Sequence, residues 1–561
     1  KINSNMEIDF ISDNKIFNFV STKDFSIESL LKSVTTGNGV IQSITYRPLV
    51  PENCSFNCKP LYAPETLVEN YPNVDIFSAP SFQVVEKLEK KSASVNKKQV
   101  YSYYGAVSNV SGLGFLGFKA TMKTNWHDDT TSIISTISKF DISRRGANTE
   151  TYTVNYQSSP SSSFAPTDFI SKAVMTYNTA IDALQANKVF KLTNSSSQQF
   201  NGLENTSSET TTVFDGYNNP TKVTTVVKNA GTLEQTTVTD IVYEDQPNAQ
   251  EYYVGRPLSK VQSVSANSQT LSSEELYTYT NHLLTTIKKK GNDPEYIIED
   301  NVYDSFGNIT TKTITAPTIG SNPAPKPRKT SYAYDTTGRF LIKSTDIEDL
   351  STTFVYNTDG TLKSETNPYG LTTTYTYDAW FKKTKTTDYL GKSTTFTYTR
   401  SGSTTLVTST GDDGSSSQET FDDLGRRIKT GAKNLNGVWI YTDYLYDIYD
   451  RNYKTSEPYS GATASQWNET IYDAYGRPTQ SKAFTGKIIT IDYTYATLVT
   501  TVTDGPKTKT TTKNAIGNVA TMTESPGGTI KYSYYANGNL KETDYDGIIT
   551  TITQDGWGRK T

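Results

Sequence analysis

One short turn motif, repeated along much of the chain, limits the folds that this sequence can adopt. Its form is Y-D-x-x-G followed by N or R, and clear copies begin at Tyr303, Tyr334, Tyr356, Phe421, Tyr472 and Tyr534. Weaker copies begin at Tyr377 and Tyr398, so the successive starts 334, 356, 377, 398 and 421 are 22, 21, 21 and 23 residues apart. Such a regular period in a chain of 561 residues predicts an array of like units instead of several unrelated domains.

The residue types in the motif predict a tight hairpin. An Asp at the first turn position can accept hydrogen bonds from backbone amides further along, and a Gly three residues later can adopt a positive φ. These are the requirements of a hairpin loop built on a type I turn. The structural turn residues predicted in this way are Asp304 and Gly307, Asp335 and Gly338, Gly360, Asp422 and Gly425, Asp473 and Gly476, and Gly538.

Aromatic residues recur two apart just before the turns, as in Tyr332 with Tyr334 and Phe354 with Tyr356. Side chains two apart share one face of a strand, so stacked hairpins would align these rings in ladders. A unit of about 21 residues holds two strands and two turns, which is marginal alone and must be stabilised by its neighbours. We therefore predict an all-β fold, a long antiparallel sheet of hairpins that coils because sheets twist.

The composition agrees with a sheet whose faces are partly exposed to solvent. Only 34% of the residues are hydrophobic, yet 39 Tyr and 22 Phe argue against disorder. We expect the coiled sheet to form part of a hollow shell. The net charge of -4 gives no basic field for nucleic acid, and no stretch approaches the ~20 apolar residues of a membrane-spanning helix.

The spacing of Gly112, Gly114 and Gly117 is G-x-G-x-x-G, which also occurs in dinucleotide-binding folds. A dinucleotide site needs a helix that opens at the last glycine, whereas the Thr-rich stretch that follows here favours a strand. We expect these glycines to permit bends and close strand approach in a β segment, with Phe115 and Phe118 buried.

No catalytic set is visible in the sequence. His127 and His282 have no nucleophile motif beside them, and neither lies at ligand spacing from a cysteine. Cys54 and Cys58 therefore form either a short loop disulfide in an oxidising compartment or two free thiols. We predict no enzyme activity, no metal and no cofactor.

One segment ahead of the repeats has helical periodicity. Ile170, Val174, Tyr177, Ile181 and Leu184 follow one another at helical spacing, and a proline precedes them at position 166. We predict a short amphipathic helix over residues 167–186 that covers a sheet edge or plugs an opening.

The Y-D-x-x-G-[NR] motif and its step resemble the Rhs or YD-repeat family, which includes the shell-forming B and C components of bacterial Tc toxins and the teneurins. The resemblance is strong from Tyr303 onward and weaker back to Phe214. Leu30 to Leu49 and Tyr101 to Phe118 resemble the stretch ahead of the repeats in B-component and SpvB-like proteins. The resemblance implies a β-rich segment at 1–125, a connecting region at 126–205, and a repeat array at 206–561 that we expect to continue beyond the chain.

Members of this family wind such sheets into a cocoon that encloses a polypeptide, often a toxic C-terminal domain released by an aspartyl autoprotease. The chain has no D-P-x-G-L-like processing motif and no toxin domain, so the resemblance implies the enclosing part alone. We expect a non-catalytic bacterial shell that is extracellular or at the cell surface. Its partners would be the remainder of its own polypeptide or a toxin cargo, and a secretion or surface protein, with no nucleic acid and no membrane insertion.

The alternative function is that of a cell-surface adhesin or carbohydrate binder. Exposed tyrosine ladders can stack on sugars, and the sequence G-D-D-G from Gly411 to Gly414 could hold calcium.

Overall fold

The computed structural model describes residues 9–12, 15–18, 30–51, 60–65, 68–156, 159–181, 190–246, 252–318 and 325–561. Its first part contains the strands β1 (Asp9–Ser12), β2 (Lys15–Asn18), β3 (Ser33–Thr35), β4 (Ile41–Leu49), β5 (Tyr62–Ala63), β6 (Asn73–Asp75), β7 (Ala79–Lys91), β8 (Asn96–Asn109) and β9 (Gly114–Thr124). The middle part contains β10 (Ser135–Asp141), the 3-10 helix η1 (Ile142–Arg144), β11 (Ala147–Val154), β12 (Ser171–Ile181), β13 (Phe190–Asn201), β14 (Thr206–Phe214), β15 (Pro220–Asn229), β16 (Thr232–Gln246), β17 (Tyr253–Ala266), β18 (Gln269–Thr280) and β19 (Leu283–Lys290).

The motif region contains shorter strands of mostly five to nine residues. They are β20 (Ile297–Tyr303), β21 (Ile309–Thr315), β22 (Arg328–Tyr334), β23 (Leu341–Thr345), β24 (Ser351–Tyr356), β25 (Leu362–Thr366), β26 (Thr372–Tyr377), β27 (Lys383–Thr387), β28 (Ser393–Ser401), β29 (Thr404–Gly411), β30 (Ser416–Phe421) and β31 (Arg427–Lys433). The remaining strands are β32 (Trp439–Tyr446), β33 (Asn452–Ser456), β34 (Trp467–Tyr472), β35 (Pro478–Lys482), β36 (Ile488–Tyr493), β37 (Val499–Asp504), β38 (Lys507–Lys513), β39 (Val519–Ser525), β40 (Thr529–Tyr534), β41 (Leu540–Tyr545) and β42 (Ile548–Thr551).

The strands β3 to β42 form one long sheet. From β8 onward each strand pairs antiparallel with the next in chain order, as expected for a row of hairpins. At the start of the sheet β3 pairs with β4, β4 with β7 and β7 with β8, while β5 is a short parallel neighbour of β8. Among the described strands no ladder joins β42 to β3, so the sheet does not close into a barrel.

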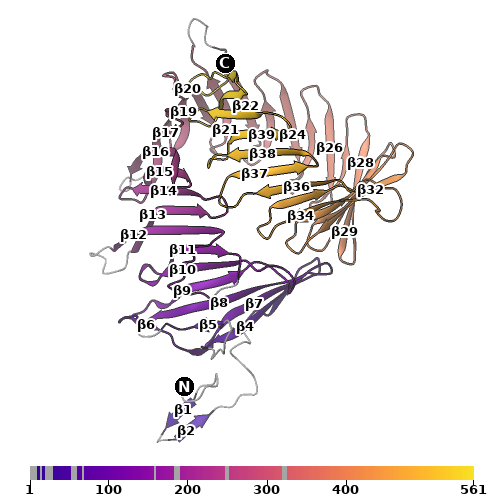
Figure 1. The fold of residues 1–561 in the computed structure, drawn as a ribbon. Coiled ribbons are helices and arrows are strands. Elements are labelled where there is room, and N and C mark those ends of the chain that lie inside the picture. Colours follow the sequence, from indigo (N-terminus) through magenta and orange to yellow (C-terminus); the bar gives the residue numbers. More distant parts are fainter. Residues whose placement is uncertain are drawn as a thin grey trace.

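The sheet coils back on itself. Figure 1 shows it rising from β4–β9 through β10–β17, turning at β19–β22, passing through β24–β32 and returning along β34–β39. The C-terminal end thereby comes to lie beside the connection between β19 and β20, where the Asn292 amide donates to the Gly556 carbonyl (Figure 1). The all-β prediction and the predicted long antiparallel sheet are confirmed.

The packed core lies at the beginning of the sheet. One buried cluster consists of Leu49, Leu61, Tyr62, Val84 and Ala106, and a second consists of Met122, Ile137 and Val154. Along the motif strands the side chains are mostly half-buried, and the aromatic face is better covered than the opposite face, as in β26 and β40. The repeats are therefore held together by their ladders and turns more than by a thick apolar core.

The predicted helix over residues 167–186 is wrong. Ser171–Ile181 form the strand β12, which pairs with β11 on one side and along its whole length with β13 on the other. Pairing with β13 satisfies the backbone groups on one side of the whole strand, and pairing with β11 satisfies those of Ser171–Val174 on the other side. This tertiary pairing overrides a local helical periodicity. The one helical element among the described residues is η1, which has three residues.

Candidate functional site at the seam of the coiled sheet

The motif turn that follows Tyr472 is closed by its Asp and its Gly. The Asp473 carboxylate accepts hydrogen bonds from the amides of Tyr475 at 2.9 Å and Arg477 at 2.8 Å, and the Gly476 amide donates to the Asp473 carbonyl at 3.1 Å. Gly476 has a φ of +86°, which glycine adopts without strain. The preceding ladder shifts register between Ile471 and Tyr472, which is the bulge expected beside such a turn.

The other predicted turn residues occupy equivalent places. Asp304 and Asp422 each accept two turn amides on one carboxylate oxygen, and so does Asp335. The glycines with a positive φ are Gly307 (+87°), Gly338 (+69°), Gly360 (+89°), Gly425 (+79°) and Gly538 (+85°). Hydrogen bonds from the Thr337 hydroxyl and the Phe340 amide hold the pKa of Asp335 below its ordinary value. The turn carboxylates are thus acceptors in a fixed local structure.

The arginine that ends many motifs has a role that sequence reasoning missed. Arg477 donates from Nε to the Asp473 carboxylate at 2.7 Å, and its guanidinium lies 4.3 Å from the ring centre of Tyr493 in the next repeat. The Tyr493 hydroxyl in turn donates to the Pro478 carbonyl at 3.1 Å. The same contacts recur between Arg451 and Tyr472, and between Arg426 and Tyr446. The sequence signal that could have indicated this role is the recurrence of arginine at the last position of the motif.

Arginine, aspartate and tyrosine therefore form a clamp between consecutive repeats. The arginine is fixed by an ion pair within its own turn and presents its flat face to the next tyrosine, which is the geometry of a cation–π contact. Because each of these three clamps joins a turn to the following hairpin, the turns from Asp422 to Arg477 are tied together along one side of the sheet. We call the row of motif turns at one end of the strands the motif edge, and the row of turns at the opposite end of the strands the plain edge.

The motif edge of the strands from β28 onward lies against the plain edge of β3–β20, and we call this contact the seam (Figure 1). Its hydrogen bonds join residues far apart in sequence but in the same order along both edges. The hydrogen-bonded pairs are Gly37 with Arg400, Ala93 with Asp423, Ser132 with Tyr449, Asn155 with Tyr475, Asp168 with Tyr495, Leu203 with Ala496, Glu234 with Ala515, Asn267 with Tyr534 and Asn292 with Gly556. The seam thus joins two successive coils of one sheet.

The most buried part of the seam is ionic. The Lys97 side chain is 2% exposed and its ammonium lies 2.5 Å from the Asp450 carboxylate, with a second bond of 3.2 Å to the Ile448 carbonyl. Arg426 binds the other oxygen of Asp450 at 2.8 Å and also reaches the Ser94 hydroxyl at 3.1 Å. Two turns of the later coil therefore hold the β7–β8 hairpin of the earlier coil by charge.

The plain edge of the later coil lies outside the seam. Five of the plain-edge turns of the later coil each carry an exposed apolar side chain near the tip, namely Ile347, Tyr369, Tyr389, Leu435 and Phe484. This row lies on the plain edge, which is the edge that the seam covers in the earlier coil.

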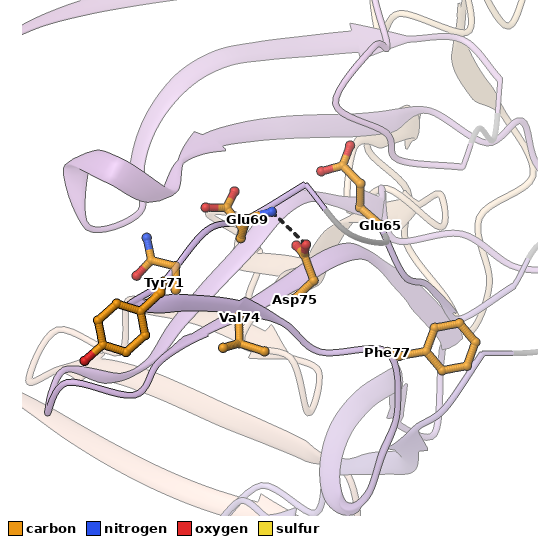
Figure 2. A pocket seen from close by; sticks show the side chains of 7 residues that line it. Glu65, Glu69, Tyr71, Val74, Asp75 and Phe77 are labelled. Atoms are coloured by element: carbon orange, nitrogen blue, oxygen red, sulfur yellow. Dashed lines mark hydrogen bonds between the residues drawn. The ribbon is translucent and has the colours of Figure 1, made fainter.

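A separate pocket of about 530 Å³ lies over β6 and is shown in Figure 2. Its acidic side chains Glu65, Glu69 and Asp75 all pair with Lys119, at 2.6, 2.8 and 3.4 Å. Although burial disfavours the charge, bonds to Glu65 and Glu69 raise the pKa of Lys119. Tyr71 and Phe77 flank the acidic group (Figure 2). One ammonium offsets only part of the charge of the three carboxylates, so the pocket keeps a net negative charge.

The glycines Gly112, Gly114 and Gly117 lie at and after the β8–β9 turn, all with positive φ. The strand β9 begins at Gly114, so no helix opens there and a dinucleotide cradle is excluded. Phe118 packs against the first core cluster and is half-buried, where full burial was predicted. Phe115 is 41% exposed, which corrects the prediction that it is buried, because it sits at the open end of the β8–β9 hairpin.

The remaining candidate residues are scattered. His127 is buried, and its Nδ1 lies 3.0 Å from the Asn125 carbonyl oxygen, whereas His282 lies in the β18–β19 turn against Tyr253. Asp412 binds Ser393 through both carboxylate oxygens. In the described part of the chain, no group of three or more His, Cys, Asp or Glu could hold a metal, and no helix could cross a membrane. Cys54 and Cys58 lie outside the described residues.

Comparison with known proteins gives a structural likeness alone. No protein-family model and no curated protein matches the sequence. The crystal structure of TcdB2-TccC3 without hypervariable C-terminal region superposes on 92% of this chain with a TM-score of 0.66 at 10% identity. The structure of TcdB2-TccC3-Cdc42 superposes on 94% with a TM-score of 0.68 at 9% identity, and that of a mutant Photorhabdus luminescens Tc holotoxin pore on 94% with a TM-score of 0.64 at 9% identity.

The chain spans about two fifths of these structures, covering 39%, 41% and 40% of their chains. At this level of identity the likeness concerns the fold. The long coiled antiparallel sheet described here is therefore a fold that is shared with components of Tc toxins.

Proposed function

We propose that this chain forms part of the wall of a non-enzymatic shell that encloses a polypeptide. The observation that carries the proposal is the seam, because a sheet that coils and is sealed to its own previous coil makes a continuous wall. The fold likeness to TcdB2-TccC3 and the resemblance of the motif to the YD-repeat family support the same function. The enclosed polypeptide would be a toxin or effector segment.

The row of Ile347, Tyr369, Tyr389, Leu435 and Phe484 is where the wall extends. In the seam a plain edge is covered by a motif edge, and exposed apolar rows mark interaction sites, so the plain edge of the later coil would receive a further coil of repeats, either from the same polypeptide or from a partner. In this proposal residues 1–125 begin the wall, 126–205 connect, and 206–561 form the repeat array. The shell would act outside the bacterial cell or at its surface.

Protease protection combined with cryo-electron microscopy of the natural full-length protein tests the proposal. We expect the coiled sheet to surround a lumen that contains chain, and this enclosed chain to resist protease. A matched Asp450→Gly variant, which loosens the seam, should shorten the protection. A sheet that surrounds no lumen, or enclosed and free segments that are digested equally fast, would refute the shell.

The absence of an enzymatic role is part of the proposal. The His127→Ala and His282→Ala variants should retain the biological effect of the natural protein with unchanged folding. Loss of a measured turnover in either variant, with the fold intact, would contradict this.

A carbohydrate-binding adhesin is the second candidate, and exposed aromatic side chains favour it. Trp380 is 82% exposed and Tyr369 is 80% exposed, both at turn tips. Stacking on sugars would quench or shift Trp380 fluorescence in a glycan titration, and the Trp380→Ala variant would lose binding. The shell proposal expects no saturable change.

A further inference from the structure

A second pocket, of about 440 Å³, lies between the β8–β9 turn and η1. Leu113, Leu116 and Phe190 supply its apolar walls, and Asn73, Ser111 and Arg145 are among its polar residues. The glycine-rich segment S-G-L-G-F-L thus borders a real pocket, although this pocket lacks the helix of a dinucleotide site.

Arg145 lines this pocket as an exposed residue and has an unusual backbone conformation. It ends η1 with a φ of +54°, and its amide donates to the Ile142 carbonyl at 3.0 Å. Glycine or asparagine is the common residue at such a position, because a larger side chain strains the left-handed conformation. The chain places a glycine one residue later, where a Cβ on Gly146 would lie 3.1 Å from the Leu116 carbonyl oxygen.

The guanidinium of Arg145 is oriented by a neighbouring aromatic ring. It lies 4.2 Å from the ring centre of Phe190, which fixes its plane by a cation–π contact. The neighbouring Arg144 is paired with Asp141. Among the described residues no carboxylate forms a salt bridge with Arg145, and no acidic side chain lines the pocket.

We infer that this pocket binds a single carboxylate carried by an apolar group. The fork of a guanidinium matches the two oxygens of a carboxylate, and one positive charge balances one negative charge. Asn73 accepts a bond from Asn109 through its side-chain oxygen at 2.8 Å, so its own amide nitrogen is a further donor. Leu113, Leu116 and Phe190 would contact the apolar part of the ligand. The inference does not depend on the shell proposal.

A ligand-observed NMR titration of the full chain with N-acetyl-phenylalanine tests the site. The carboxylate should bind, and N-acetyl-phenylalaninamide, which has the same ring without the charge, should bind at least about tenfold more weakly. The Arg145→Gly variant should lose at least about tenfold in affinity while its melting temperature stays equal or rises, because glycine accepts the left-handed backbone. Phe190→Leu, which removes the stacking partner, should weaken binding as well.

The matched control is Asn205→Gly, which places glycine at another left-handed position, with a φ of +55°, away from the pocket. This variant should bind the carboxylate like the parent chain. Absence of binding at concentrations of several millimolar, equal binding of the acid and the amide, equal binding by Arg145→Gly and the parent, or equally strong competition by inorganic phosphate would each overturn the inference.

Discussion

Removal of the Asp450 carboxylate should open the seam locally. Asp450 is the charge partner of Lys97, whose side chain is 2% exposed and otherwise reaches the Ile448 carbonyl alone. Glycine is the suitable replacement because residue 450 has a φ of +64°, which alanine would strain. In the Asp450→Gly variant a buried ammonium therefore loses its counter-charge without added backbone strain.

The expected cost follows from the burial of the pair. Loss of one partner from a buried ion pair destabilises a protein by about 3 to 5 kcal/mol. The Asp450 side chain is 43% exposed, so water reaches one side of the pair and we expect the lower end, about 3 kcal/mol. This is a roughly 100-fold increase in local opening. The Lys97→Met variant should cost below about 1 kcal/mol, because Asp450 keeps Arg426 at 2.8 Å and its water.

Hydrogen exchange of the backbone amides around 92–98 and 447–451 measures this opening. The control Asp349→Gly makes the same change at an exposed turn residue with a φ of +60°, and it should leave exchange at the seam unchanged. The Lys97→Met, Asp450→Gly double variant should resemble Lys97→Met alone. Equal effects of the two single variants, or strictly additive effects in the double variant, would refute the argument from an unpaired buried charge.

Three further predictions concern the motif turns. Gly476→Val should cost about 1 to 3 kcal/mol because its φ is +86°, whereas Gly216→Val, where a Cβ meets open space, should cost far less in the same thermal-unfolding assay. Tyr472→Phe removes a hydroxyl hydrogen bond to the preceding hairpin and should cost about 1 kcal/mol, measured as faster exchange at β33. The amide of Lys382 lowers the pKa of Asp378 below its ordinary 3.8, so the ionised turn is stabilising above that value and loses this contribution as pH falls through the lowered pKa. An Asp378→Asn variant should abolish the corresponding step in the chemical shift of that amide during acid titration, and an unchanged step would contradict the assignment.

The turns were predictable from the sequence because their chemistry is local. Asp473 and Gly476 lie three residues apart, and both the acceptor and the positive φ are properties of those residue types. The role of Arg477 was not predictable in the same way, because its contact with Tyr493 lies in the next repeat. Without a register for the neighbouring hairpin, the arginine resembles any exposed charge.

The seam and the Arg145 pocket could not be predicted from the sequence for a different reason. Lys97 and Asp450 occur in unremarkable stretches, and they are 353 positions apart, so the coil alone brings them together. The wrong helix over 167–186 has the same origin, since the periodicity of that segment says nothing about the two strands that flank β12. The local sequence pattern determines the turns, whereas tertiary pairing determines that β12 is a strand and which residues meet at the seam.

The seam also determines the order in which parts of the molecule can fold. Ladder partners along the sheet are close in sequence, whereas the seam bond from Ala93 to Asp423 spans 330 positions. Local hairpins form before such distant contacts, because closing a long loop costs entropy first. A ribosome adding about 5 to 20 residues per second needs roughly 15 to 70 seconds to make the intervening chain. During that interval the plain edge of the early strands is bare, so the nascent chain depends on its polar turns, or on a chaperone, to avoid sticking to its neighbours.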